Sequence, residues 1–311
     1  MKDIIPPVDK SLLKKELTED KFIRNTNFGQ NKIYFVTSHN SPNVMREIGR
    51  LREHTFREAG GGTGKECDID DYDTMENPYK QLIVWDPDHQ EILGGYRYFL
   101  CNNIKKDINK QLATSRLFNL SKKFIKKYLP NMVELGRSFV QPQYQATSTR
   151  KILFALDNLW DGLGALVVDN PNIKYYFGKV TMYTHFNQRA RDYILYFLYK
   201  YFGDKEKLVY PKNPLKINTT EKELKSIFKG PSYEEDYKTL SQNVRALGEN
   251  IPPLINSYMN LSPTMKMFGT ALNPNFGNVE ETGIMVTLSD MYKTKTNRYL
   301  NSYIEEKKAR K

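Results

Sequence analysis

The stretch 133–142, VELGRSFVQP, constrains the fold most, because it sets two opposite charges in an apolar, strand-like frame. Glu134 and Arg137 lie three residues apart, with Gly136 between them. Side chains alternate along a regular strand, which would place Glu134 and Arg137 on opposite faces. A bulge at Gly136 would bring both charges to one face, and glycine tolerates a bulge well. We therefore expect a strand that is broken at Gly136, with the two charges on a shared surface.

Strand-like and helix-like runs alternate along the rest of the chain, as in α/β proteins. In order, the patterns predict a strand at 32–39, a helix at 43–60, a strand pair at 81–100, a basic helix at 120–130, the strand at 133–142, a helix at 151–168, a strand at 173–182, a helix at 186–202, charged loops or short helices at 204–250 and a strand pair at 263–288. We expect one α/β domain with a mixed central sheet flanked by helices at 31–290, an N-terminal arm at 1–30 and a basic, helix-prone tail at 291–311.

The net charge of +11 favours an acidic partner, which could be nucleic acid, an anionic membrane surface or an acidic protein. Residues 102–127 concentrate this charge, with eight Lys or Arg and one Asp. No apolar run approaches the roughly 20 residues that span a bilayer, and the N-terminus lacks the pattern of a secretory signal. The two cysteines, Cys67 and Cys101, form no CxxC motif and fit a reducing compartment. We expect a cytoplasmic protein.

Several catalytic patterns are missing from the sequence. There is no GxSxG elbow and no Walker loop, and the glycine cluster at 60–64 lacks the required spacing. None of the four histidines has an Asp five residues on, and no two histidines have metal-ligand spacing. We therefore expect no metal site and no covalent thioester intermediate on a cysteine.

Four short motifs occur in an informative order. They are Leu51-Arg52-x-x-x-Phe56, Asp70-Asp71-Tyr72-Asp73, Gly94-x-x-Arg97 and Glu134-Leu135-Gly136-Arg137. The set resembles the acyl-homoserine lactone synthases, which carry R-x3-F, D-x-Y-D, G-x-x-R and E-L-[ST]-R in the same order. The E-L-G-R-S form, together with the later Leu159-Trp160-Asp161-Gly162, looks more like the ornithine N-acyltransferase family, whose members are often labelled as haemolysins. Within it, the glycine N-acyltransferase branch is the most similar, and the resemblance spans roughly residues 33–290.

This resemblance implies a GNAT-like acyltransferase. The family takes a long, often 3-hydroxylated, fatty acyl group from acyl carrier protein and passes it to the α-amine of an amino acid. No separate cofactor is then needed, because the 4′-phosphopantetheine of the carrier protein holds the acyl group. The usual Q/R-x-x-G-x-G/A pyrophosphate loop is missing at 141–151, and a helix N-terminus near 147–150 could hold the single phosphate of the pantetheine arm.

Amide formation from a thioester requires a deprotonated amine, stabilisation of the developing oxyanion and alignment of the two substrates. The resemblance makes Glu134 the candidate base, and its alternative role is a structural partner of Arg137. Tyr183, just after the 173–182 strand, is a candidate general acid for the leaving thiolate. GNAT folds carry a bulge on the strand where the acyl thioester docks, which matches the break that we expect at Gly136.

The remaining candidate site residues fall into two groups. The acceptor pocket would be formed by Arg52, Phe56, Asp70, Asp73 and Arg97. The acyl and pantetheine contacts would come from Ser138, Phe139, Val140, Thr149, Arg150 and Trp160. For the charged residues of the first group, a purely structural ion-pair network remains an equal alternative.

The partners and the substrate stay open at this point. Acyl carrier protein is acidic, which would give the basic 105–127 segment a use, while a solvated basic face or peripheral contact with an anionic membrane at the inner membrane face is the alternative. Glycine as the acceptor rests on the resemblance, and ornithine is the alternative. An acyl-homoserine lactone synthase and a basic membrane-active or nucleic-acid-binding protein are further hypotheses, although no nucleic-acid motif is present and we expect no nucleic-acid partner.

Overall fold

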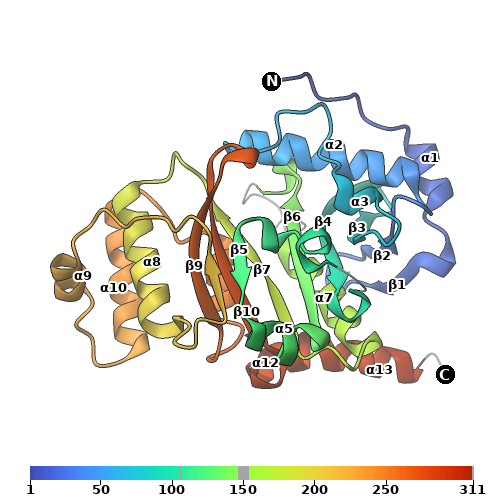
Figure 1. Ribbon diagram of the computed structural model, residues 1–311. Coiled ribbons are helices and arrows are strands. Elements are labelled where there is room, and N and C mark those ends of the chain that lie inside the picture. Colours follow the sequence, from blue (N-terminus) through green and yellow to red (C-terminus); the bar gives the residue numbers. More distant parts are fainter. Residues whose placement is uncertain (105–106, 146–153, 310–311) are drawn as a thin grey trace. The chain divides into compact units, whose positions relative to one another are not determined.

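A computed structural model describes residues 1–104, 107–145 and 154–309 of the chain (Figure 1). The chain forms two compact units, each assembled from segments that are distant in sequence. Unit 1 comprises Met1–Asp107, Asn131–Lys174 and Lys293–Lys311, and unit 2 comprises Ile108–Pro130 and Tyr175–Tyr292. The expected division of the chain at residues 30 and 290 stays a prediction.

Unit 1 is built on an antiparallel sheet with the strand order β1-β2-β3-β4-β6. Its strands are β1 (Phe22–Asn25), β2 (Lys32–Val36), β3 (Lys80–Asp86), β4 (Glu91–Leu100) and β6 (Met132–Val140). β3 and β4 form the predicted hairpin, and β6 is the predicted charged strand. All residues of β3 except the first are buried, so both faces of this sheet are covered.

Two long helices of unit 1 lie against opposite faces of that sheet. Helix α2 (Pro42–Glu58) buries an apolar stripe of Val44, Ile48 and Leu51 and reaches Gln81 of β3 through Arg52. Helix α7 (Ala155–Asp169) lies on the other face, where a Cβ on Gly162 would be 2.6 Å from the Leu82 side chain. Since Gln81 and Leu82 are neighbours on one strand, they point to opposite faces, which places the two helices on opposite sides.

The segments at the two ends of the chain add further elements to unit 1. Helix α1 (Lys10–Glu16) and edge strand β1 come from the first thirty residues. The tail forms α12 (Lys293–Thr296), the π-helical η8 (Asn297–Asn301) and α13 (Ser302–Ala309), which confirms its predicted helical character. Tyr299 and Tyr303 donate hydrogen bonds to Asp157 and Asp169, so this tail is fastened to α7.

The glycine cluster after α2 forms a loop that turns back onto the helix and is held there by Glu53. Gly60, Gly62 and Gly64 all have positive φ, between 74° and 93°. These conformations suit glycine and turn the loop back onto the helix. Glu53 accepts hydrogen bonds from the backbone N–H groups of Thr63 (3.0 Å) and Gly64 (2.7 Å). The N–H groups of Gly60 and Gly61 donate to the helix carbonyls of Arg57 and Phe56, so the cluster ends the helix.

Unit 2 has an antiparallel sheet of order β7-β10-β9 and a small β5-β8 ladder. Its strands are β5 (Phe118–Leu120), β7 (Tyr175–Met182), β8 (Val209–Pro211), β9 (Lys266–Asn273) and β10 (Val279–Thr287). Its helices are α4 (Ile108–Gln111), α5 (Lys122–Lys127), α8 (Gln188–Phe202), α9 (Glu221–Ile227), α10 (Tyr233–Ala246) and α11 (Pro253–Met259). The predicted strands at 173–182 and 263–288 and the helix at 186–202 are confirmed.

Two expectations for unit 2 need correction. The basic helix expected at 120–130 is only the six-residue α5, because Leu120 is taken up by the pairing of β5 with β8. The 204–250 region contains α10, a full helix of 14 residues. Its N-cap Ser232, its acidic first turn and its buried Leu240 and Val244 account for the stability of this helix.

Candidate active site

The site of unit 1 is built around a break in strand β6. On β4, Gly95 pairs with Phe139 and Arg97 pairs with Gly136, so two residues of β6 stand opposite one residue of β4. The predicted bulge is therefore confirmed. Its position is shifted by one residue, because the left-handed conformation is taken by Arg137 (φ +49°) and not by Gly136. A non-glycine residue in this region is uncommon and carries some backbone strain.

This break brings the two charges of β6 into one cluster. Glu134 pairs with Phe99 on β4, on the same face as Arg97, and it accepts a hydrogen bond from the Tyr79 hydroxyl. The Tyr79 ring lies under the Arg97 guanidinium, 5.1 Å from its carbon. Arg137 Nη2 lies 3.8 Å from an oxygen of Asp70, a residue that Arg97 also binds. Glu134 and Arg137 thus lie on one face, as predicted, and are linked through Tyr79, Arg97 and Asp70.

The acidic loop before β3 supplies the carboxylates of the cluster. Asp70 caps helix α3 (Asp71–Thr74) by accepting from Tyr72 N–H at 3.0 Å. In turn, the Asp73 carboxylate accepts a hydrogen bond from Asp70 N–H at 3.1 Å. This capping box explains the Asp-x-x-Asp spacing in local terms, because it satisfies two N–H groups at the start of a helix. The remaining carboxylate oxygens are directed to arginines.

Three arginines from three elements meet these carboxylates. Arg52 of α2 lies 3.3 Å from Asp73 and donates to Gln81, which itself donates to Asp73 at 2.9 Å. Arg97 of β4 binds Asp70 at 2.7 Å and Asp73 at 3.2 Å. The Arg52 side chain is fully buried. Such a burial of charge requires the paired, hydrogen-bonded surroundings seen here.

Burial and the arginines act on the carboxylates in opposite directions. Burial raises the pKa of Asp68, and the charges of the three nearby arginines reduce that rise. Burial also opposes ionisation of Asp70, but the charge and hydrogen bond of Arg97, with Arg137 and Arg52, hold the pKa of Asp70 below its usual value. Asp70 is therefore anionic at neutral pH and matches the cationic side of the cluster.

Most predicted acceptor residues come together in this cluster, and three of its members were missed by sequence reasoning. Arg52, Asp70, Asp73 and Arg97 form one network, and the Phe56 ring lies 6.0 Å from the Arg137 guanidinium carbon. The missed residues are Asp68, Tyr79 and Gln81. Gln81, a polar residue opening an apolar strand, and Asp68, two residues before Asp70, were signals that could have been followed.

The other predicted site residues are more scattered. Phe139 is buried, while Ser138 and Val140 are half-buried at the end of β6. Trp160 is buried in α7 and stacks on Tyr299, with ring centroids 6.0 Å apart.

Three further predicted residues have no shown relation to the cluster. Tyr183 belongs to unit 2, where it stacks on His185, and burial raises its pKa to about 12. Thr149 and Arg150 lie outside the described residues. The roles given to all of these residues stay predictions.

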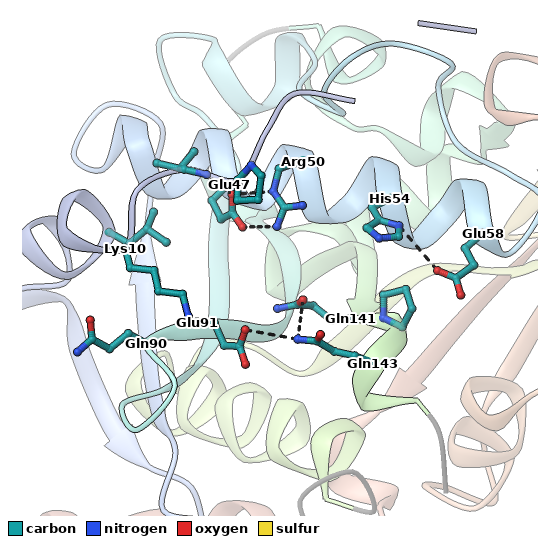
Figure 2. A pocket seen from close by; sticks show the side chains of 13 residues that line it. Lys10, Glu47, Arg50, His54, Glu58, Gln90, Glu91, Gln141 and Gln143 are labelled. Atoms are coloured by element: carbon teal, nitrogen blue, oxygen red, sulfur yellow. Dashed lines mark hydrogen bonds and ion pairs between the residues drawn. The ribbon is translucent and has the colours of Figure 1, made fainter. Parts of the chain in front are cut away.

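A hollow of about 320 Å³ lies on another part of unit 1 (Figure 2). It is lined by Pro7, Val8, Lys10, Leu13, Glu47, Arg50, His54, Glu58, Gln90, Glu91, Gln141, Pro142 and Gln143. Figure 2 shows Glu47 bound to Arg50 and His54 facing Glu58. Glu47 Oε1 lies 2.6 Å from Arg50 Nη2, and Glu58 Oε2 lies 3.7 Å from His54 Nδ1. We assign no ligand to this hollow.

Comparison with known proteins identifies the family. Over 309 residues, 98% of this chain, the sequence is 57% identical to the glycine N(alpha)-acyltransferase of Phocaeicola vulgatus and covers 95% of that protein. It is 58% identical over 308 residues to the glycine N(alpha)-acyltransferase of Bacteroides thetaiotaomicron, again over 98% of this chain and 91% of the relative. The chain belongs to the glycine N(alpha)-acyltransferase family.

Family membership agrees with the domain assignment. Residues 51–155 match the acetyltransferase (GNAT) domain, a range that holds all four sequence motifs and the charge cluster. The predicted GNAT-like α/β fold, with a mixed central sheet flanked by helices, is thereby confirmed, and the protein is an acyltransferase. The acyltransferase family also replaces the hypothesis of a membrane-active or nucleic-acid-binding protein.

A solved structure is similar to this chain, and the described residues show neither a membrane-spanning helix nor a metal-binding group. The crystal structure of the AHL synthase LasI is similar at 15% identity, covering 48% of this chain and 71% of that one, with a TM-score of 0.33. Among the described residues, no helix is long and apolar enough to cross a membrane. In the same part of the chain, no group of three His, Cys, Asp or Glu side chains could hold a metal ion.

Proposed function

We propose that this protein is an N-acyltransferase that moves a long-chain, 3-hydroxylated fatty acyl group from acyl carrier protein to the α-amine of glycine. The product would be N-acyl glycine, which is the first intermediate of glycine lipid synthesis. The observation that carries the proposal is the identity of 57–58% over nearly the whole chain with two glycine N(alpha)-acyltransferases. The charge cluster on β6 supports it, because an amino acid brings both a carboxylate and an ammonium to its site.

The reaction needs a base, and Glu134 is our candidate. The amine nitrogen attacks the thioester carbonyl carbon, a C–N bond forms, and the C–S bond breaks. The proton lost by the amine passes to Glu134, directly or through a water, and the thiolate takes a proton as it leaves. Glu134 is 1% exposed and hydrogen-bonded to Tyr79, so its position is well defined for this role. Tyr183 remains the candidate donor for the thiolate.

The bulge on β6 is our candidate site for the thioester. Backbone N–H groups near Phe139 and Val140 would bind the developing oxyanion and the pantetheine arm, since preorganised N–H donors stabilise charge that appears in the transition state. The strain at Arg137 (φ +49°) supports this proposal, because strained backbone is concentrated at functional sites.

The basic segment of unit 2 supports acyl carrier protein as the donor. Residues 108–130 hold six Lys or Arg and no acidic residue. Pairing of β5 with β8 joins this segment to the chain around Lys212, which is also exposed. An acidic carrier protein would be attracted to such a surface. Reversing the charge of the exposed Lys122 and Lys126 to Glu should therefore raise KM for an acyl-carrier-protein donor more than for the matching coenzyme A thioester.

The experiment that tests the function is lipid mass spectrometry of a host that expresses the protein. Wild type should produce N-acyl glycine, and Glu134→Ala should not, although both proteins accumulate in folded form. N-acyl ornithine in place of N-acyl glycine would show that the acceptor is wrong. The absence of any new acyl amide, with folded wild-type protein present, would contradict the acyltransferase proposal as a whole.

A further inference from the structure

The charge cluster contains three arginines, and they differ in exposure. The Arg52 side chain is 0% exposed, Arg97 is 5% exposed, and Arg137 is 17% exposed. Arg52 is held by Asp73 and Gln81, and Arg97 by Asp70, Asp73 and two tyrosine rings. Arg137 contacts Asp68, Asp70 and the Phe56 ring, and it has the most exposed side chain of the three arginines.

Arg137 has an exposed neighbour of opposite charge. The Asp70 side chain is also 17% exposed, and one of its oxygens lies 3.8 Å from Arg137 Nη2. The two groups present a cation and an anion side by side at the edge of a cluster that is otherwise buried. An amino acid carries a carboxylate and an ammonium two bonds apart, so its charges match this pair in sign and in spacing.

Asp68 lies behind Arg137 and is nearly inaccessible, at 1% exposure. Its Oδ2 is 2.9 Å from Arg137 Nε, and neither carboxylate oxygen accepts an aligned hydrogen bond from the described residues. The backbone at Asp68 is fixed, because its N–H donates to the Gly49 carbonyl of α2 at 3.0 Å. Gly49 allows this approach, since a Cβ there would be 2.7 Å from the Ile69 side chain. A buried carboxylate on a rigid support thus faces the Nε side of Arg137.

We propose that Arg137 binds the carboxylate of the amino-acid acceptor, that Asp70 receives its ammonium, and that Asp68 is a positioning residue that orients the Arg137 guanidinium. This inference rests on the proposed function and adds the groups that select an α-amino acid over other amines. A guanidinium has five N–H donors, so Asp68 can face Nε while the outer edge binds a carboxylate in the bidentate way that arginine favours. Arg137 lies in the bulge of β6, and its side chain lies beside Asp68 and Asp70.

The test compares glycine with glycinamide, which has the same amine but no carboxylate. Purified full-length wild type, Arg137→Gln, Asp68→Asn and the double variant are assayed with both acceptors, and with both carrier-protein and coenzyme A thioesters as donors. Arg137→Gln should raise KM for glycine roughly 10- to 100-fold, the range of a lost charged hydrogen-bond pair, and leave KM for glycinamide nearly unchanged. Asp68→Asn should act in the same direction and add little to Arg137→Gln in the double variant.

The matched control is Asp161→Asn. Asp161 is a buried carboxylate of unit 1 whose pKa burial raises to about 6, and it binds Asn27 outside the charge cluster. This variant should keep the wild-type preference for glycine. Arg137→Lys, which keeps the charge but loses the planar fork, gives a second measurement should Asp68→Asn not fold, and it should show an intermediate KM for glycine.

Three results would overturn the inference. Equal losses for glycine and glycinamide would mean that Arg137 and Asp68 act on the fold or on the chemistry and not on the carboxylate. Full additivity of the two substitutions would mean that Asp68 does not act through Arg137. Unchanged KM for glycine in both single variants would remove the assignment while leaving the proposed function intact, whereas a wild type that acylates neither acceptor would refute that function itself.

Discussion

Asp73→Asn is the substitution that most sharply tests the energetics of the charge cluster. The Asp73 side chain is 0% exposed and lies 3.3 Å from Arg52 and 3.2 Å from Arg97. Asparagine keeps the size of the side chain and can still accept the hydrogen bond from Asp70 N–H. It removes the charge that compensates Arg52, whose other hydrogen-bond partner in the cluster, Gln81, is neutral.

The expected loss of unfolding free energy depends on the contacts that Arg52 and Arg97 keep in the variant. Arg97 keeps its 2.7 Å contact with Asp70, but Arg52 has no exposed surface through which water could solvate it. Removing one partner of a buried ion pair typically costs about 3–5 kcal/mol, a large share of the roughly 5–15 kcal/mol that stabilises a domain. The matched control is Glu58→Gln on α2, whose contact with His54 is 3.7 Å long between side chains that are about half exposed. Such a surface pair contributes at most about 1 kcal/mol.

Tryptophan fluorescence during urea unfolding measures this cost directly. The two tryptophans, Trp85 and Trp160, both belong to unit 1, so their signal reports the unit that carries the cluster. Asp73→Asn should lower the unfolding free energy by about 3 kcal/mol or more, and Glu58→Gln should leave it nearly unchanged. A loss below about 1 kcal/mol for Asp73→Asn would refute the view that Arg52 depends on this carboxylate.

Three further predictions concern the same unit. The pKa of Asp70 is held below its usual value, so its ionised form stabilises the fold above about pH 3.9, and this stabilisation is lost as the pH falls further. The difference in unfolding free energy between wild type and Asp70→Asn should therefore shrink below about pH 4. Gly94→Ala should destabilise by about 1–3 kcal/mol, since its Cβ would be 2.5 Å from a backbone oxygen of β6, whereas Gly136→Ala meets nothing within 4 Å and should be neutral in the same urea assay. Tyr79→Phe removes a donor to the buried Glu134 and should cost about 1–3 kcal/mol, and an unchanged midpoint would show that this hydrogen bond contributes nothing.

Local patterns predicted the elements of the fold well. The stripe of Val44, Ile48 and Leu51 predicted α2, and the apolar run with a Pro-containing turn predicted the β3–β4 hairpin. These patterns report one face or one strand at a time, which is why they succeed without knowledge of tertiary contacts. The short α5 shows the limit, because the pairing of Leu120 with β8 depends on a residue far along the chain.

The site was predicted only in part, for a physical reason. The spacing of Glu134 and Arg137 predicted the bulge on β6. The residue that takes the left-handed conformation depends on the register with β4, and it is Arg137, whereas the sequence suggested Gly136. The partners of each charge lie far apart in sequence, since Tyr79 reaches Glu134 and Asp68 reaches Arg137 only after loop and sheet have assembled. Motif spacing identified the arginines and left open which carboxylate each one meets.

Mass spectrometry of the products made by the purified protein is the most direct test of the central claim. The reaction would contain 3-hydroxyacyl carrier protein with glycine and ornithine at equal concentration. Our account predicts N-acyl glycine as the main product, with loss of that product in Glu134→Ala. A preference for ornithine, or no amide with either amino acid while the protein is folded, would contradict it.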